Sequence, residues 1–423
     1  MIYLTGTGMG NLTGATVCAL DAIKRSELLI GSRRLALEAG KIYPEKKIYS
    51  ANPDPESMME IIRKKCDINS TDISILYSGD TLFYSGASRM AEYLGERDIP
   101  FVILPGISTC QYMAARLGRS YEGWNLLSSH GRSIDIGGEL MKKSPLFLLT
   151  SGKKDCEVIL DELSDTGIEG ISVTIAEDLS YASEKIIKGE PAGIKKALSG
   201  SDVENDGSGH GLIALLIDAP VPLTASGAIE DDAFVRGESP MSKQYVRSMI
   251  LSLLRIDADD ICLDIGAGTG AVTIDMAMHA KKVYSVECID ERTELIKKNI
   301  RKFKAYNVSV IKGDAADILE DPSAASVENV TKIFIGGSDG RLSKIFKQIN
   351  ESFPNAVTVF SAVLYETLSE GTRALDELGM DYEIMQLSIS RAKGSDHGHM
   401  LKAENPVYLV RAGRFQGNIP GVS

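Results

Sequence analysis

The chain has 423 residues, enough for about two or three domains, and its composition of 43% hydrophobic and 25% charged residues is ordinary for a globular protein. Its net charge of −12 argues against a general nucleic-acid-binding protein, which would carry a basic surface. An anionic substrate must therefore be held by a local cluster of basic side chains rather than by the overall field.

The sequence also gives expectations about compartment and metals. It contains no run of about 18 apolar residues, so no membrane span is predicted. The N-terminus lacks the basic region and apolar core of a signal peptide. The six cysteines are scattered without a Cys-x-x-Cys pair, which favours reduced core residues in a cytoplasmic protein. Only His397 and His399 are close in sequence among the five histidines, so no metal site is predicted.

In the first half, strand-like and helix-like segments alternate, and glycine-rich loops follow several strands. Predicted strands are 1–5, 28–31, 72–77, 100–104, 125–128, 145–150, 171–176, 186–188 and 211–218, and predicted helices are 13–26, 58–65, 88–95, 109–117 and 156–166. Residues 200–209 are predicted to be an exposed loop. This order indicates an α/β domain over 1–218, with lobes 1–110 and 115–218 and ligands at the carboxyl ends of the strands.

A stretch with proline and small residues, 219–239, is the predicted linker. A helix is expected to start there, with Ser239 as its N-cap and Pro240 at its first position. The second domain is predicted over 240–415 and a frayed tail over 416–423. Its predicted strands are 260–264, 282–287, 308–311, 332–335, 356–361, 382–390 and 407–411.

The stretch Asp264-Ile-Gly-Ala-Gly-Thr-Gly270 joins a predicted strand to a predicted helix, 271–278. Its spacing is Gly-x-Gly-x-Gly, whereas a dinucleotide site would need Gly-x-Gly-x-x-Gly. Asp264 would repel a pyrophosphate but suits the ammonium group of a methionine moiety. At the end of the next strand, Glu287 can hold both hydroxyls of a ribose. A plain tight turn is the alternative.

These features resemble the class I S-adenosylmethionine (SAM) methyltransferases. The resemblance implies that the backbone of Gly266, Gly268 and Gly270 and the Asp264 side chain meet the methionine part of SAM. It also implies that Asp314 and Ala315 meet the adenine. Gly336 and Gly337 would end the strand beside the methyl acceptor. A helix cap is the alternative for Asp314, and an ordinary turn is the alternative for Gly336 and Gly337.

Motifs in both halves resemble known families. Gly6-Thr-Gly-Met-Gly10, Ser78-Gly-Asp-Thr-Leu-Phe-Tyr84, Leu104-Pro-Gly-Ile-Ser108 and Ser129-His-Gly-Arg132 resemble the tetrapyrrole methylases (class III SAM methyltransferases). Pro240-Met-Ser-Lys243, Lys312-Gly-Asp-Ala315, Phe334-Ile-Gly-Gly337 and Gly398-His-Met400 resemble the decarboxylating corrin methyltransferases. The fusion implies a two-lobed tetrapyrrole methylase domain followed by a Rossmann-like class I domain.

The resemblance implies a bifunctional enzyme of cobalamin biosynthesis. It would methylate a precorrin-6B or cobalt-precorrin intermediate at C5 with the first domain and at C15 with the second, with loss of the C12 acetate carboxyl. Two SAM sites per chain are expected. The sequence leaves open the presence of cobalt and the order of the two methylations.

In the first domain the resemblance places SAM between the lobes. Gly6–Gly10 would shape the trough for the macrocycle. The residues expected at SAM are Gly79, Asp80, Thr81, Phe83, Ser108 and Thr109, and those expected at substrate carboxylates are Arg116, His130 and Arg132. A buried, hydrogen-bonded histidine is the alternative for His130. Met9 and Thr81 stand where the family has proline, so a non-catalytic module that holds the intermediate is an alternative for this half.

A polycarboxylate macrocycle needs cationic partners in the second domain as well. Lys243 and Arg247 are spaced i, i+4 on one predicted helix face. The other basic candidates, Arg391, Lys393, His397 and His399, cluster in 390–400. Lys243 or His399 is a candidate acid or base for decarboxylation. Solvated charges on a surface loop are the alternative.

The expected partners are the tetrapyrrole and a second copy of the chain in a homo-oligomer, with neither nucleic acid nor membrane. A different methyl acceptor, such as RNA or another small molecule, remains an alternative. The negative charge and the lack of basic and aromatic stretches disfavour RNA.

Overall fold

The computed structural model describes residues 1–9, 11–12, 14–130, 132, 134–142, 144–199, 213–223, 227–395 and 398–413. The chain divides into two compact units, one built from most of residues 1–219 and one built mainly from residue 220 onward. Among the described residues, no helix combines the length and the apolarity that a membrane crossing requires.

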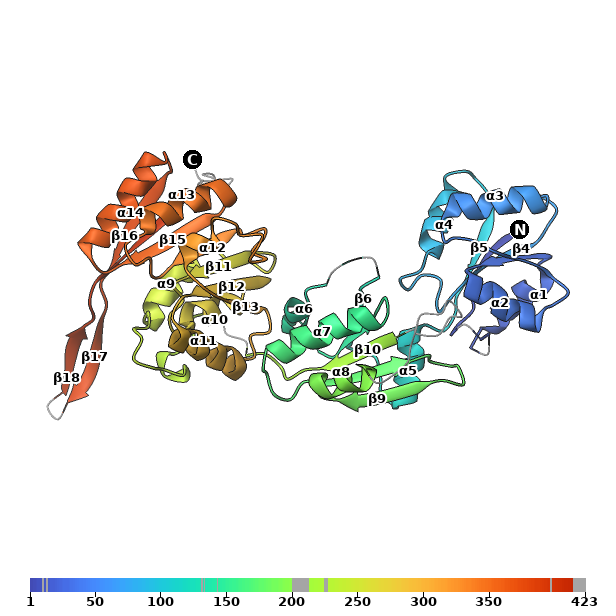
Figure 1. The fold of residues 1–423 in the computed structure, drawn as a ribbon, viewed down its shortest axis with the longest axis horizontal. Helices are drawn as coiled ribbons and strands as arrows, with labels where there is room; N and C mark the ends of the chain where they lie inside the picture. The colour runs from blue at the N-terminus through green and yellow to red at the C-terminus, as the bar shows by residue number, and fades with distance from the viewer. Residues whose placement is uncertain are drawn as a thin grey trace. The chain divides into compact units, whose positions relative to one another are not determined.

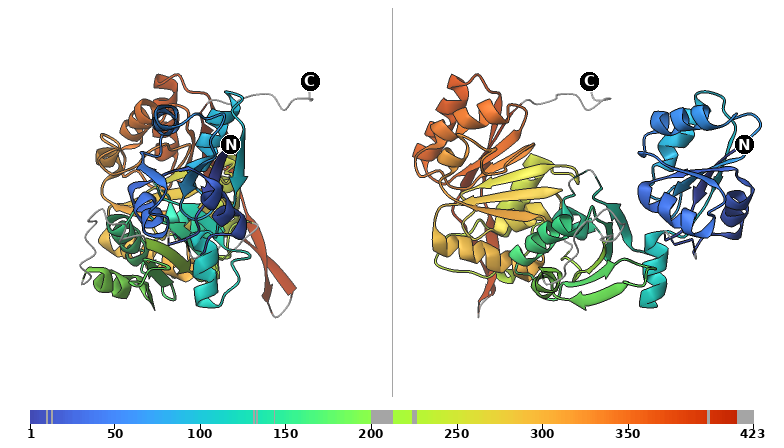
Figure 2. Two further views of the ribbon diagram at one scale, coloured as in Figure 1. Left: turned by 90° about the vertical axis from the view of Figure 1, so that its right-hand side faces the viewer. Right: turned by 45° about the vertical axis from the view of Figure 1, so that its right-hand side comes forward.

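The first lobe of the first unit is a parallel sheet in the order β3-β2-β4-β1-β5. Its strands are β1 (Ile2–Gly6), β2 (Leu28–Gly31), β3 (Lys47–Ser50), β4 (Ile73–Tyr77) and β5 (Phe101–Leu104). Its helices are α1 (Val17–Arg25), α2 (Arg33–Ile42), α3 (Pro55–Lys65) and α4 (Ala87–Gly95). Strands β2 and β4 are buried along their whole length, because helices cover both faces of the sheet (Figure 2, right).

The second lobe contains a mixed sheet in the order β6-β7-β10-β8-β9. Its strands are β6 (Asn125–Ser128), β7 (Leu146–Leu149), β8 (Ser172–Glu177), β9 (Lys185–Gly189) and β10 (Ile213–Asp218). The remaining helices of this half are α5 (Thr109–Leu117), α6 (Ile136–Lys142), α7 (Lys153–Asp165) and α8 (Pro191–Ser199). Only β6 and β7 pair in parallel, and the fully buried Phe147 lies in the core.

The second unit is built on a sheet in the order β13-β12-β11-β14-β15-β19-β16 (Figure 1). Its strands are β11 (Ile261–Ile265), β12 (Lys282–Glu287), β13 (Val308–Lys312), β14 (Lys332–Ile335), β15 (Val357–Ala362), β16 (Tyr382–Leu387) and β19 (Val407–Ala412). Strands β11 to β15 are parallel, and β19 is antiparallel to both β15 and β16. The chain moves outward from β11 first through β12 and then through β14, which makes a topological switch point between β11 and β14. Ligands bind at such points in open α/β sheets.

Helices cover both faces of this sheet (Figure 1). One face carries α12 (Ala315–Ile318), α13 (Leu342–Ser352) and α14 (Tyr365–Glu377), and the other carries α9 (Gln244–Leu254), α10 (Ala271–Ala277) and α11 (Asp290–Phe303). A two-stranded ribbon, β17 (Ser390–Ser395) and β18 (Gly398–Ala403), extends away from the sheet. The predicted α/β class, with a two-lobed first half and a Rossmann-like second half, is confirmed.

Three local predictions are wrong. The helix expected from Ser239 begins at Gln244, because the chain before it is extended and the Ser242 carbonyl accepts from Arg247 instead of from a helical amide. The single strand expected over 382–390 ends at Leu387, and the segment after it, for which a surface loop was only the alternative, is a ribbon. Not all cysteines are core residues, since Cys18 and Cys288 are exposed free thiols.

Candidate active site

A cavity of about 260 Å³ lies at the carboxyl ends of β11, β12 and β14 in the second unit. Of the residues predicted to bind SAM or the methyl acceptor there, seven line it: Gly266, Gly268, Glu287, Asp314, Ala315, Gly336 and Gly337. They come from loops that are far apart in sequence and meet at the switch point. We call this cavity the donor pocket.

Close packing requires glycine at Gly266, which lines the donor pocket, and at Gly270, which was also predicted to meet SAM but lies outside the lining. Gly266 has φ +69°, and a Cβ there would lie 2.6 Å from the Gly337 carbonyl oxygen and 2.7 Å from its nitrogen. Gly270 has φ +74° and begins α10, where a Cβ would press on Ile296 at 3.1 Å. The turn therefore places two backbone segments closer than any side chain allows, while the amides of Gly266 and Gly268 donate within the chain, to the Val286 carbonyl and to Glu287.

Glu287 closes the turn at the end of β12. Its side chain is buried, with Oε2 accepting from the Gly268 amide at 2.9 Å. Oε1 accepts from the amides of Cys288 at 3.0 Å and Ile289 at 3.1 Å. The carboxylate is thus fixed at the pocket wall by three backbone donors, and its remaining lone pairs are available to a hydroxyl-bearing ligand.

Asp264 is not in the donor pocket, so the prediction that it meets the methionine ammonium is wrong. Successive strand residues point to opposite faces, and Asp264 points toward α10. There it is fully buried, and the Thr273 hydroxyl donates to its Oδ2 at 2.5 Å. Its Oδ1 has no partner among the described residues. Burial raises the pKa of Asp264 to about 7, and the Thr273 hydrogen bond acts in the opposite direction.

This raised pKa predicts a pH-dependent stability. The unfolded value is about 3.9, so between that pH and about 7 the folded state holds a proton that the unfolded state has lost. The free energy of unfolding therefore falls as pH rises through this window, by up to on the order of 4 kcal/mol.

Asp264→Asn is expected to remove this pH-dependent decrease in the free energy of unfolding. Urea-dependent hydrogen exchange of peptides covering β11, at pH 4.5 and 7.5, would measure it in wild type and variant. Parallel pH dependence in the two proteins would contradict the protonation of Asp264.

Two arginines at the donor pocket had no sequence signal. Arg341 pairs with Asp314, whose Oδ1 also caps α12 by accepting from the Ala316 amide at 2.9 Å. Arg292 lies 4.0 Å from Glu287 Oε1 and donates to the Ser239 hydroxyl at 3.1 Å. Neither belongs to a recognisable motif, and both reach the pocket only because the sheet order brings α11 and α13 beside it.

A larger cavity of about 1250 Å³ adjoins the donor pocket, and Pro240 and Gly336 line both. We call it the acceptor cavity. Lys243, predicted as a catalytic residue, lines it at the residue before α9. Arg391 of β17 and Lys402 of β18, which face each other in register, line it as well. Lys402 was missed because the ribbon that pairs it with Arg391 was not predicted.

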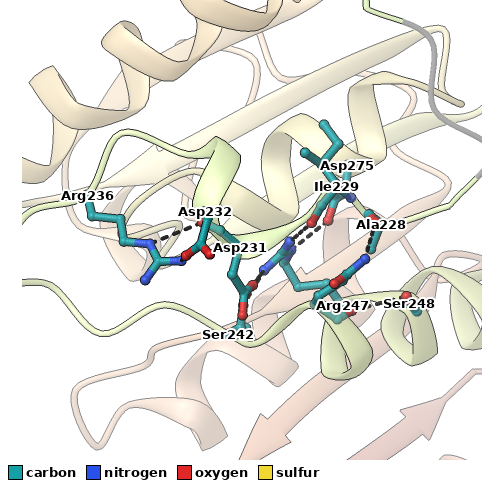
Figure 3. Close-up of polar contacts among 10 residues, drawn as sticks. Ala228, Ile229, Asp231, Asp232, Arg236, Ser242, Arg247, Ser248 and Asp275 are labelled. Atoms are coloured by element: carbon teal, nitrogen blue, oxygen red, sulfur yellow. Dashed lines mark hydrogen bonds and ion pairs between the residues drawn. The ribbon is translucent and has the colours of Figure 1, made fainter. Parts of the chain in front are cut away.

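The prediction that Arg247 binds substrate carboxylates is wrong. Its side chain is fully buried and paired with Asp231 at 2.7 Å and Asp275 at 2.6 Å (Figure 3). The i, i+4 spacing from Lys243 does not put the two side chains on one face, because Lys243 precedes the helix.

The other predicted basic residues lie on or near the ribbon. His399 is exposed on β18 opposite Gly394 and does not line the acceptor cavity. Arg391 lies 3.6 Å from Glu404. His397 and the Lys393 side chain lie outside the described residues. Across the part of the chain that is described, no group of three His, Cys, Asp or Glu side chains could hold a metal ion.

The first unit has its own cavity, of about 340 Å³, between β4, β5 and the second lobe. Of the predicted residues there, Gly79, Asp80, Phe83, Ser108, Thr109 and His130 line it. His130 Nδ1 lies 3.3 Å from the Ser151 hydroxyl. Desolvation lowers the pKa of His130, while Asp155 acts in the opposite direction.

Three predicted residues lie outside this lining. Thr81 is buried and donates to the Leu104 carbonyl at 3.3 Å, so the prediction that it contacts SAM is wrong. Arg116 pairs with Glu184 at 2.6 Å, and Arg132 donates to the Ser128 carbonyl at 2.7 Å. Gly8 pairs with Gly79 through a short bridge, while Gly10 lies outside the described residues.

One arginine of this cavity was missed. Arg34 on α2 lines it and donates to the Tyr181 hydroxyl at 2.7 Å and to the Ser78 hydroxyl at 2.8 Å. Arg34 itself lies in no recognised motif, although Ser78 begins the Ser78–Tyr84 motif and Tyr181 comes from a loop far along the chain.

Comparison with known proteins matches both halves. The family described as "Tetrapyrrole (Corrin/Porphyrin) Methylases" matches residues 1–193, and "Precorrin methyltransferase domain" matches residues 232–412. A Pyrobaculum calidifontis protein named "Probable cobalt-precorrin-6B C(15)-methyltransferase (decarboxylating)" is 34% identical over 193 residues, which are 44% of this chain and 96% of that protein. The chain belongs to the precorrin methyltransferase family.

Two further similarities concern the same half of this precorrin methyltransferase. A protein of the same name from Methanocaldococcus jannaschii is 30% identical over 187 residues, covering 44% of the chain and 98% of that protein. A solved structure named precorrin-6y C5,15-methyltransferase, from Geobacter metallireducens, is 28% identical with a TM-score of 0.41, covering 44% of this chain and 96% of that one. The chain is thus a SAM-dependent methyltransferase with a tetrapyrrole methylase domain in its first half.

Proposed function

We propose that the chain methylates a precorrin-6B or cobalt-precorrin intermediate of cobalamin biosynthesis at two carbons. The first unit acts at C5, and the second acts at C15 and removes the carboxyl of the C12 acetate. The observation that carries the proposal is the shared wall of the second unit, where Pro240 and Gly336 line both the donor pocket and the acceptor cavity. A methyl donor and a large acceptor could meet there.

The residues of the donor pocket fit SAM. The Gly266 turn is a cradle that a single Cβ would fill, and Glu287 is held at the wall where a ribose needs acceptors. When bound, SAM supplies an electrophilic methyl group. The chain's own task is to align the acceptor carbon and exclude water, and such positioning supplies roughly 7–11 kcal/mol of a barrier.

The acceptor cavity fits a large polycarboxylate. Its volume of about 1250 Å³ exceeds the roughly 300–1,000 Å³ that is usual for small-molecule sites. Lys243, Arg391 and Lys402 line it, and we propose that they hold acetate and propionate groups. The Glu404 carboxylate lines the same cavity 3.6 Å from Arg391, so the lining carries three cations and one carboxylate, and this excess of positive charge is what an acidic chain needs for an anionic substrate.

Lys243 is the proposed proton donor during decarboxylation. Loss of carbon dioxide leaves an electron pair that the conjugated ring takes up, and protonation or methylation at the ring carbon then removes it. Lys243 lines the acceptor cavity three residues after Pro240, which lines both cavities. His399, the other predicted acid or base, lies outside the cavity lining.

The first unit is proposed to hold a second SAM molecule. The support is its own cavity, in which the Gly79–Asp80 loop of the first lobe meets His130 of the second. A homo-oligomer stays a prediction.

Incubation of the purified chain with SAM and precorrin-6B, followed by mass spectrometry, tests the proposal. The expected product gains two methyl groups and loses one carbon dioxide. One added methyl with the carboxyl retained would contradict the assignment of the second unit. Isothermal titration with S-adenosylhomocysteine is expected to give two sites per chain, whereas a single site would favour a first unit that only holds the intermediate.

Lys402→Glu is expected to raise KM for the tetrapyrrole at least about tenfold. The substitution replaces a cation that would pair with a substrate carboxylate by an anion that repels it. S-adenosylhomocysteine affinity should not change, since Lys402 does not line the donor pocket. Lys347→Glu, an exposed residue on α13, is the matched control for net charge. Equal KM values for the two variants would contradict a role for Lys402 in substrate binding.

A further inference from the structure

Residues 229–243, here called the strap, run from Ile229 to Lys243 across the second unit. The strap has little regular structure, with a single turn of 3-10 helix at Asp231–Ala233. Its end nevertheless supplies Pro240 to both the donor pocket and the acceptor cavity, and Lys243 to the acceptor cavity. Something outside the strap must therefore fix its position.

Arg247 holds both ends of the strap. Its Nη2 donates to the Ile229 carbonyl, and its Nη1 pairs with Asp231 Oδ1 at 2.7 Å, both near the start. The same Nη1 donates to the Ser242 carbonyl at 2.5 Å, near the end. Its Nε donates at 2.6 Å to Asp275 of α10, which anchors the group to the sheet's helical layer (Figure 3).

Other contacts hold the middle of the strap against the glycine turn. Asn299 of α11 is buried, accepts from the Val235 amide at 2.8 Å and donates to the Thr269 carbonyl at 2.9 Å. The Phe234 ring lies under the Arg247 guanidinium, 4.9 Å from its centre. The strap, the glycine turn and the Arg247 site are therefore one connected network.

Stability alone does not account for a buried arginine at this place. Replacing a buried ion pair by apolar residues of similar volume is often neutral or stabilising. A guanidinium, however, offers five N–H donors in a rigid planar fork, which a lysine cannot reproduce. Arg247 donates from this planar group to acceptors at both ends of the strap and on α10. Its particular contribution is therefore to fix the positions of these segments relative to one another.

We propose that Arg247 is a positioning residue for methyl transfer. By drawing the two ends of the strap together, it fixes Pro240 between donor and acceptor and presents Lys243 to the acceptor cavity. This inference rests on the proposed function, in which the two cavities hold the two reactants.

Loss of the Arg247 contacts should lower kcat more than it lowers the affinity for the methyl donor. A displacement of about 1 Å at the reacting centre can cost about 100-fold in rate. We expect kcat to fall by about that factor in Arg247→Lys. The affinity for S-adenosylhomocysteine should stay within about threefold, because Glu287 and Asp314 are held by backbone amides that lie outside the strap.

The test compares three variants of the full chain. Arg247→Lys keeps the charge and loses the fork. Because Arg247→Met alone would bury an unpaired Asp275, it is combined with Asp275→Asn. Asp231→Asn removes the charge of a partly exposed partner, keeps an oxygen that can accept from Arg247, and leaves the Arg247–Asp275 pair intact, so it is expected to fold and to weaken the network least. Arg236→Met is the matched control, since it removes an exposed ion pair with Asp232 on the strap itself (Figure 3).

Three measurements separate positioning from a structural role. They are kcat and KM with precorrin-6B, S-adenosylhomocysteine affinity by calorimetry, and hydrogen exchange of the peptide 239–245 with S-adenosylhomocysteine bound. The expected result is faster exchange of that peptide and lower kcat in all three Arg247-network variants, with Arg236→Met like wild type.

Wild-type kcat and wild-type exchange of residues 239–245 in the folded Asp231→Asn and Arg247→Lys proteins would overturn the inference. Failure of the proposed function gives a different pattern. The wild type would then leave precorrin-6B unchanged, while the exchange comparison would still report whether Arg247 fixes the strap.

Discussion

Gly266→Ala is expected to abolish methyl-donor binding in the second unit. At φ +69° an alanine is strained by roughly 1–2 kcal/mol, and its Cβ would also lie 2.6 Å from the Gly337 carbonyl oxygen. The Gly337 backbone is itself part of the pocket wall, so it cannot retreat without opening the pocket. We expect S-adenosylhomocysteine affinity at this site to fall by at least about 100-fold, or about 2.7 kcal/mol.

Calorimetry on the full chain measures this loss, with thermal unfolding to check that the second unit remains folded. Gly394→Ala is the control, because a Cβ at Gly394 meets nothing within 4 Å. With precorrin-6B, the Gly266 variant should still add one methyl but not the second. Two added methyls and normal donor affinity in a folded variant would show that this turn is not the donor site.

Gly106→Ala should give the complementary defect in the first unit. A Cβ at Gly106 would lie against the Gly79 carbonyl oxygen and 2.8 Å from the Gly6 carbonyl carbon. These glycines end β1 and follow β4 and β5, so the added carbon would force apart the loops that carry Gly79 and Ser108 to the cavity. We expect methylation by this unit to fall at least about 100-fold.

The product should then carry one methyl group and lack the acetate carboxyl. Gly95→Ala at the end of α4 is the control, since a Cβ there meets nothing within 4 Å. Two methyl groups in the product of a folded Gly106→Ala protein would contradict catalysis in the first unit. Together with Gly266→Ala, this variant assigns each methyl to one half of the chain.

Most strands of the sheets could be predicted because they are short apolar runs, several of them followed by glycine loops, whereas the short, partly exposed β3 was not predicted. Strand β11 and its Gly-x-Gly-x-Gly turn are local features, so the turn, Glu287 and the Asp314 loop could be found before any fold was known. The start of α9 was predicted too early, because the N-cap is Lys243, whose backbone is still extended, and not Ser239.

Site residues that belong to a single loop motif could be predicted from the sequence. Site residues that reach a cavity only through the packing of separate elements could not. Alternation along β11 allows either face for Asp264, and only the packing of α10 decides that its side chain meets Thr273. Whether Arg247 faces a cavity or the core cannot be read from its spacing to Lys243. Arg341 and Lys402 reach their cavities only through the order of strands and the register of the ribbon, which no short motif encodes.

The position of β19 inside the sheet has a consequence during translation. Strand β16 leaves the ribosome before β19, yet β19 is its neighbour in the sheet and joins it to β15. Until residues 407–412 emerge, the nascent chain therefore carries an unpaired β16 and an open edge at β15. Such edges invite wrong pairing, so this half of the protein should depend on chaperones until β19 has been inserted.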